Sequence, residues 1–541
     1  MTNQDGEHGA CSQRSDNLPV LDDSISYDEF FEKFMIANQP CLFKGTINQW
    51  RSIKEWVDSN GRPNFQYLSQ HFGDTTVPVS NCGKEQYGSQ PKADMLMRDF
   101  IKYWQEYIEE DYNENKRCLY LKDWHFTKIF PDYNAYETPV YFTSDWLNEF
   151  WDCTRQDSKS CDDYRFVYMG PKNSWTPLHA DVFRSFSWSA NICGSKRWLI
   201  YPPGEEEFLR DKYGNLPFDV TSSEMNDKTK FPKLSQLKQC IEVIQRAGEV
   251  IFIPSGWHHQ VFNLDDTISI NHNWFNGCNV NIVWEFLKSE LLAVQRSIYD
   301  CKDMDEWDEQ CQLIMKANTG IDYAEFVNFL TTIARPRMRL ILEIVMQHES
   351  SWPKLAVNPE IDQHENCIDE DDIQTKHYLQ VNRPIENHSE HVSPENNLDL
   401  KVFDNIIQAN DSGSYSENQS QKSIIFKSNS ADRLLKAEEE NILKLEMNKG
   451  HGCRITYKRS NDEVDCEMTS KIDPRRCLLS NDRRHLLFDL LRLKDVMDKL
   501  LMEPEFKFVK LERLIVNPVE ILDKVKSILA KVENSGLSVR L

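Results

Sequence analysis

Short runs of apolar and β-branched residues, separated by turn residues, fill the central part of the chain between residues 164 and 275. The runs cover residues 166–169, 185–193, 198–201, 241–244, 250–253, 261–264 and 267–271. They are separated by Gly170-Pro171, Gly194, Pro202-Pro203-Gly204, Gly248 and Pro254-Ser255-Gly256. Many short strands with regular turns predict an antiparallel sandwich or barrel.

Apolar residues at helical spacing lie on both sides of this β-rich region. They predict helices over residues 27–35, 95–107, 281–349, 431–445, 486–501 and 519–532. Pro518 stands immediately before the last of these, a position typical of a helix start. We expect the C-terminal helices to pack on each other and back onto the β-rich region.

Residues 353–430 differ from the rest of the chain in composition, because they are rich in Asn, Ser, Asp, Glu and Gln and contain few large apolar residues. Such a segment cannot bury enough apolar surface to offset the entropy of ordering, which predicts a disordered insert. The expected organisation is a disordered leader (1–20), a β-rich domain (21–280), a helical extension (281–352), the insert (353–430) and a C-terminal helical region (431–541).

Charge and cysteine usage narrow the possible partners and compartments. The chain has 63 basic and 86 acidic residues, a net charge of −23. A surface this negative repels phosphate backbones and anionic lipid, so we expect no direct nucleic-acid binding and no membrane binding. Residues 1–17 lack the apolar segment of a secretory signal. The 15 cysteines form no C-x-x-C pair, which predicts reduced thiols in an intracellular protein and excludes zinc ribbons.

His179-Ala180-Asp181 is the one H-x-D sequence in the chain. Residues i and i+2 of a strand share a face, so this spacing directs an imidazole and a carboxylate at one point. Two histidines and one carboxylate on a metal leave coordination positions open, an arrangement suited to Fe(II) and oxygen chemistry. The pair alone is more typical of a hydrogen-bonded histidine at a strand end beside an aspartate in a turn, so the hypothesis needs a second histidine.

A later strand supplies that histidine, but the pattern leaves two candidates. The apolar run 250–253 ends in the turn Pro254-Ser255-Gly256, which leads into His258 and His259. Adjacent strand residues point to opposite faces, so only one of the two can reach the metal. Both faces carry mixed residues, and alternation therefore does not choose between them.

Residues of about 20–280 resemble the JmjC-domain family of 2-oxoglutarate oxygenases. In that family the distal metal ligand opens an H-x-V-x-N sequence, which His259-Gln260-Val261-Phe262-Asn263 matches and His258 does not. The resemblance implies that His179, Asp181 and His259 bind iron. It also implies a mainly β fold with α elements, in which a double-stranded β-helix (a cupin-like jelly roll) carries flanking helices and a helical C-terminal region.

The same resemblance implies a set of cosubstrate ligands. Family members bind the distal carboxylate of 2-oxoglutarate with a lysine two positions after a glycine, and Lys196 stands in that place after Gly194. A lysine there forms a charge-assisted hydrogen bond to the carboxylate. Thr176, three residues before His179, matches a family hydroxyl that bonds the cosubstrate. Ser189 and Asn271 are expected to line the same pocket. Tyr120 and Tyr168 are candidates for the walls of the pocket, although packing in the core is the favoured interpretation for both.

The segments 179–189 and 267–274 are similar to a subgroup of this family that hydroxylates a lysine of the eukaryotic translation release factor. The resemblance implies a cytoplasmic protein lysyl hydroxylase that affects translation termination. It would use Fe(II) as cofactor and 2-oxoglutarate and O2 as cosubstrates. Three alternatives are a histone lysine demethylase, a catalytically silent binding scaffold and a cupin metalloenzyme that does not use 2-oxoglutarate. The lack of a zinc-finger reader and of a strongly basic region argues against the demethylase, and the intact triad with Lys196 argues against the scaffold.

Overall fold

The computed structural model describes residues 14–15, 18–154, 163–351, 445–446, 454–455 and 483–535. The chain divides into two compact units, one of residues 1–352 with 467–541 and one of residues 353–466. In the second unit the structure describes the strands β15 (Leu445–Glu446) and β16 (Arg454–Ile455), which pair antiparallel. The predicted insert (353–430), most of the predicted leader and nearly all of the predicted helix 431–445 lie outside the described residues.

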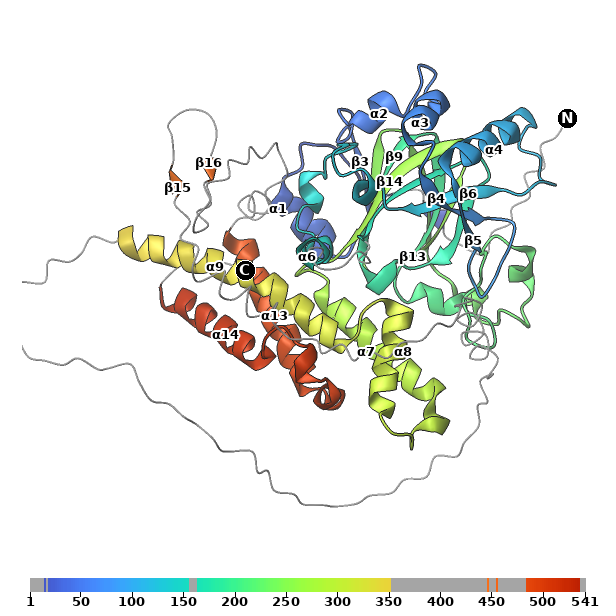
Figure 1. Cartoon of the computed structure of the whole chain (residues 1–541). Coiled ribbons are helices and arrows are strands. Elements are labelled where there is room, and N and C mark those ends of the chain that lie inside the picture. The colour runs from blue at the N-terminus through green and yellow to red at the C-terminus, as the bar shows by residue number, and fades with distance from the viewer. Residues whose placement is uncertain are drawn as a thin grey trace, which may run out of the picture. The chain divides into compact units, whose positions relative to one another are not determined.

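Two sheets, both mainly antiparallel, form the β-rich part of the first unit (Figure 1). In spatial order the first contains β1 (Arg14–Ser15), β11 (Cys240–Arg246), β10 (Ser195–Tyr201), β13 (His258–Asn263) and β8 (Trp175–His179). The second contains β2 (Val20–Leu21), β3 (Cys41–Lys44), β12 (Glu249–Ile253), β9 (Phe186–Cys193), β14 (Thr267–Trp274), β7 (Arg165–Gly170), β6 (Leu119–Trp124), β4 (Thr76–Asn81) and β5 (Lys92–Leu96). The predicted cupin-like jelly roll is confirmed, although β1 and β2 begin inside the range expected to be an unstructured leader.

Side chains from both sheets meet in a shared apolar core. Trp198, Ile200 and Val261 of the first sheet pack in one cluster with Ile251 and Ile253 of the second. Within the two sheets, β10 pairs with β13 and β12 pairs with β9, which joins residues about 60 positions apart in sequence. The two sheets therefore enclose an interior between them, and the strands that carry the predicted site residues line it.

Strand β9 shows how the sequence separates the inner and outer faces of the second sheet. All eight of its residues are buried. Phe186, Trp188, Ala190 and Ile192 alternate along it and join a large apolar cluster with residues of the N-terminal helices, including α4 (Met97–Glu109). The intervening residues are polar and face the opposite way. A buried polar face needs partners, so it marks the position of a site inside the barrel.

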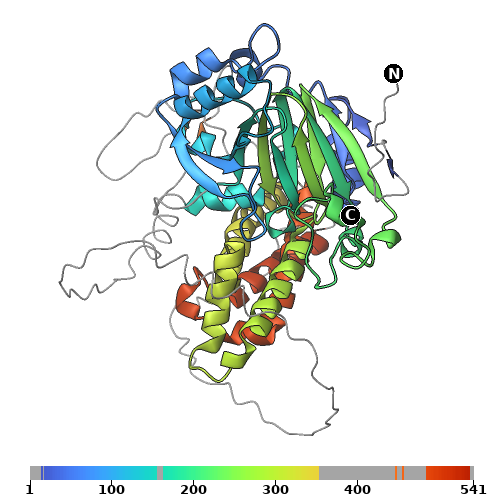
Figure 2. The ribbon, with the colours of Figure 1, turned by 90° about the vertical axis from the view of Figure 1, so that its right-hand side faces the viewer.

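Helices cover one side of the β-rich part. They are α7 (Val280–Ser297), α8 (Trp307–Thr319), α9 (Tyr323–Ser351), α13 (Arg483–Met502) and α14 (Pro518–Asn534). Figures 1 and 2 show α9, α13 and α14 side by side, and α13 also contacts α7. The helical extension and the C-terminal helices therefore form one bundle. None of the described helices combines the length and apolarity that crossing a lipid bilayer would require.

A buried arginine joins this bundle to the rest of the unit. Arg337 of α9 is 1% exposed. Its Nε donates to Asp489 of α13 at 2.9 Å. Its Nη1 and Nη2 donate to the two carboxylate oxygens of Glu149, at 3.0 and 3.1 Å. Glu149 belongs to α6 (Trp146–Thr154). Burial raises the pKa of Asp489 to about 6, although the Arg337 charge opposes the rise. The guanidinium therefore stabilises two carboxylates that would otherwise be buried without a cation.

Arg337→Lys is expected to lower the free energy of unfolding by about 2 kcal/mol, because lysine keeps the charge but cannot bond both carboxylates in one plane. Arg339→Lys on the same helix is the matched control, since the Arg339–Glu343 pair is exposed and contributes at most about 0.5 kcal/mol. Denaturant unfolding of both variants measures the difference. Equal shifts in the two would contradict a role for Arg337 in holding α6, α9 and α13 together.

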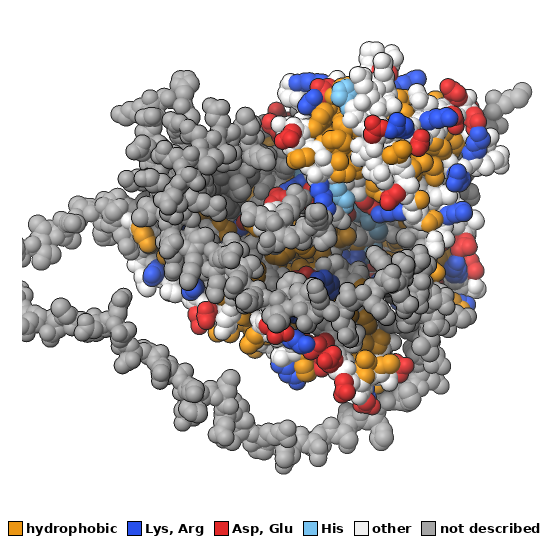
Figure 3. All heavy atoms as spheres, in the orientation of Figure 1, with side chains coloured by type: hydrophobic (Ala, Val, Ile, Leu, Met, Phe, Trp, Pro, Cys, Tyr) orange, Lys and Arg blue, Asp and Glu red, His pale blue; other side chains and the backbone are white. Residues whose placement is uncertain are grey.

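The surface over the sheets carries charges of both signs. On the face drawn in Figure 3, basic and acidic side chains lie next to one another among apolar ones. The described residues include ion pairs with exposed members, such as Arg51–Glu55 and Lys116–Glu110. Such pairs contribute little to stability.

Candidate metal and cosubstrate site

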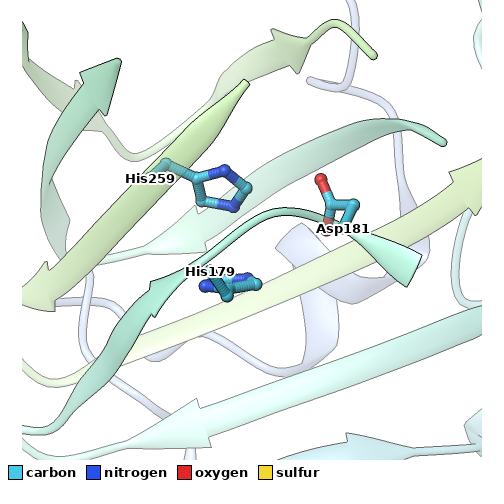
Figure 4. Close-up of side chains that lie close together, drawn as sticks. All are labelled: His179, Asp181 and His259. Carbon is cyan, nitrogen blue, oxygen red and sulfur yellow. The ribbon is translucent and has the colours of Figure 1, made fainter. Parts of the chain in front are cut away.

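His179, Asp181 and His259 meet in the interior between the sheets. His179 ends β8, Asp181 precedes the short 3-10 helix Val182–Arg184, and His259 is the second residue of β13. β8 and β13 pair antiparallel with His179 directly opposite His259, and the two rings are 4.3 Å apart between centroids. Figure 4 shows the three side chains close together. One ligand atom from each of the three residues lies within 4.8 Å of the others. This is the separation expected of ligands around one metal ion.

Hydrogen bonds orient each of these three side chains. The Nδ1 atoms of His179 and His259 lie 2.8 Å from the carbonyl of Pro177 and 3.1 Å from the carbonyl of Trp257. A carbonyl only accepts, so each Nδ1 carries the proton and each Nε2 keeps a free lone pair. The Asp181 carboxylate accepts from the hydroxyl of Ser187 at 2.6 Å. The protein therefore holds two imidazoles and one carboxylate in the state in which they bind a metal.

Burial, together with the neighbouring imidazole of His259, lowers the pKa of His179 to about 4. The ring is therefore neutral at physiological pH, and a metal ion does not have to displace a proton from it. Two neutral imidazoles and one carboxylate are the donor set of non-haem Fe(II) sites, so the residues present fit that ion.

His258 points away from this group. Its Nε2 accepts a hydrogen bond from Nη1 of Arg184 at 3.1 Å. Burial and the Arg184 charge lower the pKa of His258 to about 3, so the imidazole is a neutral acceptor. Of the two histidines that alternation left open, the structure brings His259 to the site and His258 to an arginine on the other face of β13.

Lys196 is a buried lysine near the start of β10. It is 2% exposed, and its Nζ donates to the hydroxyl of Tyr120 at 3.2 Å. Burial lowers the pKa of Lys196 to about 7, and no carboxylate of the described residues forms an ion pair with it. Its neighbours on the opposite face have acidic partners, since Ser195 donates to Asp265 and Arg197 pairs with Glu242 at 2.6 Å. A buried ammonium without an anion fits the binding of an external carboxylate.

A bulge explains why Thr176 lies on the same side as His179 although the two are three positions apart in the strand. His259 pairs with His179, but Val261 pairs with Thr176, so β8 has one residue more than β13 between these pairs. Paired residues point to the same face, and His259 and Val261 share one by alternation. The extra residue therefore returns Thr176 to the inner face that carries His179.

Ser189 and Asn271 form a polar pair on the inner face of the second sheet. They are directly opposite each other on β9 and β14, and the Ser189 hydroxyl donates to Oδ1 of Asn271 at 3.2 Å. Ser189 is two residues from Ser187, the partner of Asp181, and therefore points the same way.

Tyr120 and Lys122 also belong to this interior, and the sequence did not single out Lys122. Tyr120, for which core packing was favoured over a place in the pocket wall, is 3% exposed, and its hydroxyl accepts a hydrogen bond from Lys196. Lys122 follows on the same face of β6, is 8% exposed and donates to Oε1 of Gln90 at 2.9 Å. Alternation along a strand could have linked the two, but nothing in the sequence placed that strand beside β10.

Known proteins resemble the part of the chain that contains these residues. The family described as a cupin-like domain matches residues 27–279. The 2-oxoglutarate and iron-dependent oxygenase JMJD4 of Gallus gallus is 55% identical over 341 residues, which is 62% of this chain and 79% of that protein. JMJD4 of Homo sapiens is 51% identical over 322 residues, 59% of this chain and 76% of that protein. The arginine-specific demethylase JMJ20 of Arabidopsis thaliana is 42% identical over 340 residues, 60% of this chain and 72% of that protein.

Proposed function

This chain belongs to the JmjC family of 2-oxoglutarate and iron-dependent oxygenases, as its motifs predicted, and on that basis we propose that it is a protein lysyl hydroxylase. In this proposal His179, Asp181 and His259 hold the iron, and Lys196 holds the distal carboxylate of 2-oxoglutarate. The observation that supports it most directly is the convergence of the three ligand atoms within 4.8 Å in the same interior as an unpaired buried lysine. Membership of this family sets aside the cupin metalloenzyme that does not use 2-oxoglutarate.

When bound, iron supplies the oxidation chemistry, in which O2 converts 2-oxoglutarate to succinate and CO2 and a C–H bond of the substrate to C–OH. The protein's own residues orient and protect these groups. The carbonyls of Pro177 and Trp257 fix the two imidazoles, and Ser187 fixes Asp181. Such outer contacts contribute strongly to metal affinity.

Lys196 and Tyr120 are placed to bind the carboxylate together. The Lys196 ammonium provides the charge, and the Tyr120 hydroxyl, now its acceptor at 3.2 Å, is free to donate to the incoming oxygen. Arrival of an anion favours the charged form of the lysine, so its pKa rises when the cosubstrate binds. Thr176, Ser189 and Asn271 complete the polar lining of the pocket in this proposal.

We infer that the substrate is a lysine of the eukaryotic translation release factor and that the reaction takes place in the cytoplasm. The support is the resemblance of segments 179–189 and 267–274 to the subgroup that acts on this factor. The net charge of −23 is compatible with a lysine-bearing protein partner.

A second candidate is demethylation, because a relative 42% identical to this chain is named an arginine-specific demethylase. Hydroxylation and demethylation of a side chain use the same iron centre and differ in the substrate carbon that is oxidised. The choice between the two therefore depends on how the substrate lies in the site.

The experiment that tests the function uses the full chain, loaded with Fe(II) and 2-oxoglutarate without oxygen and then exposed to O2. Recombinant release factor, a methylated histone tail and a methylarginine peptide are offered separately. We expect succinate with the release factor and a lysine heavier by one oxygen atom. Loss of a methyl group from either methylated peptide, with the release factor unchanged, would favour the demethylase. Absence of succinate with every substrate would favour the silent scaffold.

A further inference from the structure

A stripe of aromatic side chains lies along the inner face of β7. Tyr164 stands just before the strand, and Phe166 and Tyr168 follow at alternate positions; all three are partly exposed. Ring centroids are 6.4 Å apart between Tyr164 and Phe166, and 6.3 Å apart between Phe166 and Tyr168. Phe166 is paired with Asn271 of β14, so the stripe shares the face that carries the polar pocket lining.

The stripe connects the loop of the metal ligands with the cosubstrate lysine. At one end, the Tyr164 ring is 5.7 Å from the ring of Phe183, two residues after Asp181. At the other end, the Tyr168 ring is 6.1 Å from the ring of Tyr120, which contacts Lys196. A side chain that reaches the metal over β7 therefore passes across these rings.

Asp123 lies beside Tyr168, at the end of the stripe that is near Tyr120. Its Oδ1 accepts from the hydroxyl of Tyr168 at 2.7 Å, and 32% of its side chain is exposed. The pairing of β6 with β7 is irregular here, since Leu121 pairs with Met169 but Trp124 pairs with Val167. Asp123 lies in that irregularity with φ at 61°, in the left-handed region. Bulges redirect side chains, and such strained residues gather at functional sites.

A lysine of the protein itself forms an ion pair with the Asp123 carboxylate. Lys92 of the edge strand β5 forms an ion pair with Oδ2 of Asp123, although half of the Lys92 side chain is exposed. The other nearby cation, Lys122, donates to Gln90 instead. Burial would raise the pKa of Asp123, but the charge of Lys92 and the Tyr168 hydroxyl outweigh it and hold that pKa below its usual value. The carboxylate is therefore ionised at physiological pH and accessible from solvent.

We propose that Asp123, positioned by Tyr168, binds the cationic end of the substrate side chain, and that Lys92 fills this place until the substrate arrives. The aromatic stripe accepts the methylene stem of a lysine, as apolar surfaces do for long cationic side chains. The carboxylate then accepts a charge-assisted hydrogen bond from the ammonium. The inference rests on the proposed function, because it assigns a binding site to the lysine that the enzyme hydroxylates.

Asp123→Asn tests the charge without disturbing the backbone, because asparagine also tolerates the left-handed conformation. The variant is expected to raise the KM for the lysine-bearing substrate roughly 10- to 100-fold, as expected for the loss of one charged hydrogen bond. The KM for 2-oxoglutarate is the contrasting measurement and should change far less than the KM for the lysine-bearing substrate, since Asp123 does not contact Lys196.

Lys92→Met gives the opposite result, because it removes the internal competitor for Asp123. The KM for the substrate is expected to fall by about threefold. If the Lys92–Asp123 pair were only structural, both variants would weaken binding in the same direction. Lys33→Met, which breaks the exposed Lys33–Glu29 pair on another face, is the matched control and should change nothing.

A binding measurement keeps this inference separate from the proposed function. The full chain with Fe(II) and 2-oxoglutarate, kept without oxygen, is titrated with N-acetyl-lysine methylamide and with its norleucine counterpart, and ligand NMR signals report binding. Wild type should prefer the lysine compound, Asp123→Asn should lose the preference and Lys92→Met should strengthen it. Equal binding of the two compounds to wild type would overturn the inference even if lysine hydroxylation occurs. A preference for lysine without hydroxylation would support it while the proposed function fails.

Discussion

His259→Ala is expected to abolish iron binding and 2-oxoglutarate turnover, whereas His258→Ala retains both. The two residues are adjacent and both buried, but only His259 lies with His179 and Asp181 within ligand distance of a common point. Loss of a contact one step outside the ligands typically costs 10- to 100-fold, so loss of a ligand should reduce turnover by more than about 100-fold. Succinate formation and anaerobic Fe(II) titration measure the two effects.

His258→Ala controls for general damage to β13. It removes the partner of Arg184 and leaves a buried cavity, so a moderate loss of thermal stability is expected together with iron binding close to one equivalent. A variant of His258 that loses iron while His259→Ala keeps it would show that the metal lies on the other face of the strand. Equal loss in both variants would remove the reason for assigning His259 to the site.

Lys196→Met is expected to raise the KM for 2-oxoglutarate by about 30- to 1,000-fold, which corresponds to roughly 2–4 kcal/mol of lost binding. Methionine preserves the length and volume of the side chain and removes its charge. Iron binding should persist, because Lys196 contacts Tyr120 and none of the three proposed ligands. The variant therefore separates cosubstrate binding from metal binding.

The same substitution should stabilise the protein in the absence of cosubstrate. The pKa of Lys196 is lowered from 10.5 to about 7, so the unfolded chain binds the proton more tightly than the folded chain. The contribution of Lys196 to stability is therefore most favourable above pH 10.5 and falls as the pH decreases toward about 7, by a few kcal/mol in total, and it levels off below that. Lys196→Met removes this group and should flatten that part of the pH profile.

Thermal unfolding at pH 7 and pH 10, with and without 2-oxoglutarate, measures both effects. The wild type should melt higher when 2-oxoglutarate and a metal ion are present, because ligands that bind only the folded state stabilise it. Lys196→Met should melt higher than the wild type without cosubstrate at pH 7 and gain nothing from its addition. A variant that is less stable at pH 7, or that still responds to 2-oxoglutarate, would contradict a role for Lys196 as an unpaired cosubstrate lysine.

The fold class followed from local patterns in the sequence. Short runs separated by glycine and proline predicted β7, β9 and β12 within one residue, whereas the runs predicted for β10, β13 and β14 miss three residues at one end of each strand. The predicted helices 486–501 and 519–532 correspond to α13 and α14 for the same reason, since apolar spacing of this kind depends on nearby residues. The strands β4 and β5 were not predicted, because Pro78 and the charged residues of β5 conceal the alternation.

What the sequence determined by itself about the site is which residues share a face: alternation linked His179 with Asp181 and separated Lys196 from Arg197. It did not determine which face is the inner one, because that depends on strand pairing between distant segments. The pairing of β8 with β13 directs His259 rather than His258 to the interior, and the bulge opposite Val261 brings Thr176 to the same side. The position of β6 between β4 and β7 has the same effect. It brings Tyr120 into contact with Lys196. It also brings Asp123 into contact with Tyr168 and Lys92. A shift by one residue in any of these pairings turns every side chain of that strand to the other face, so the site itself was decided by the tertiary structure.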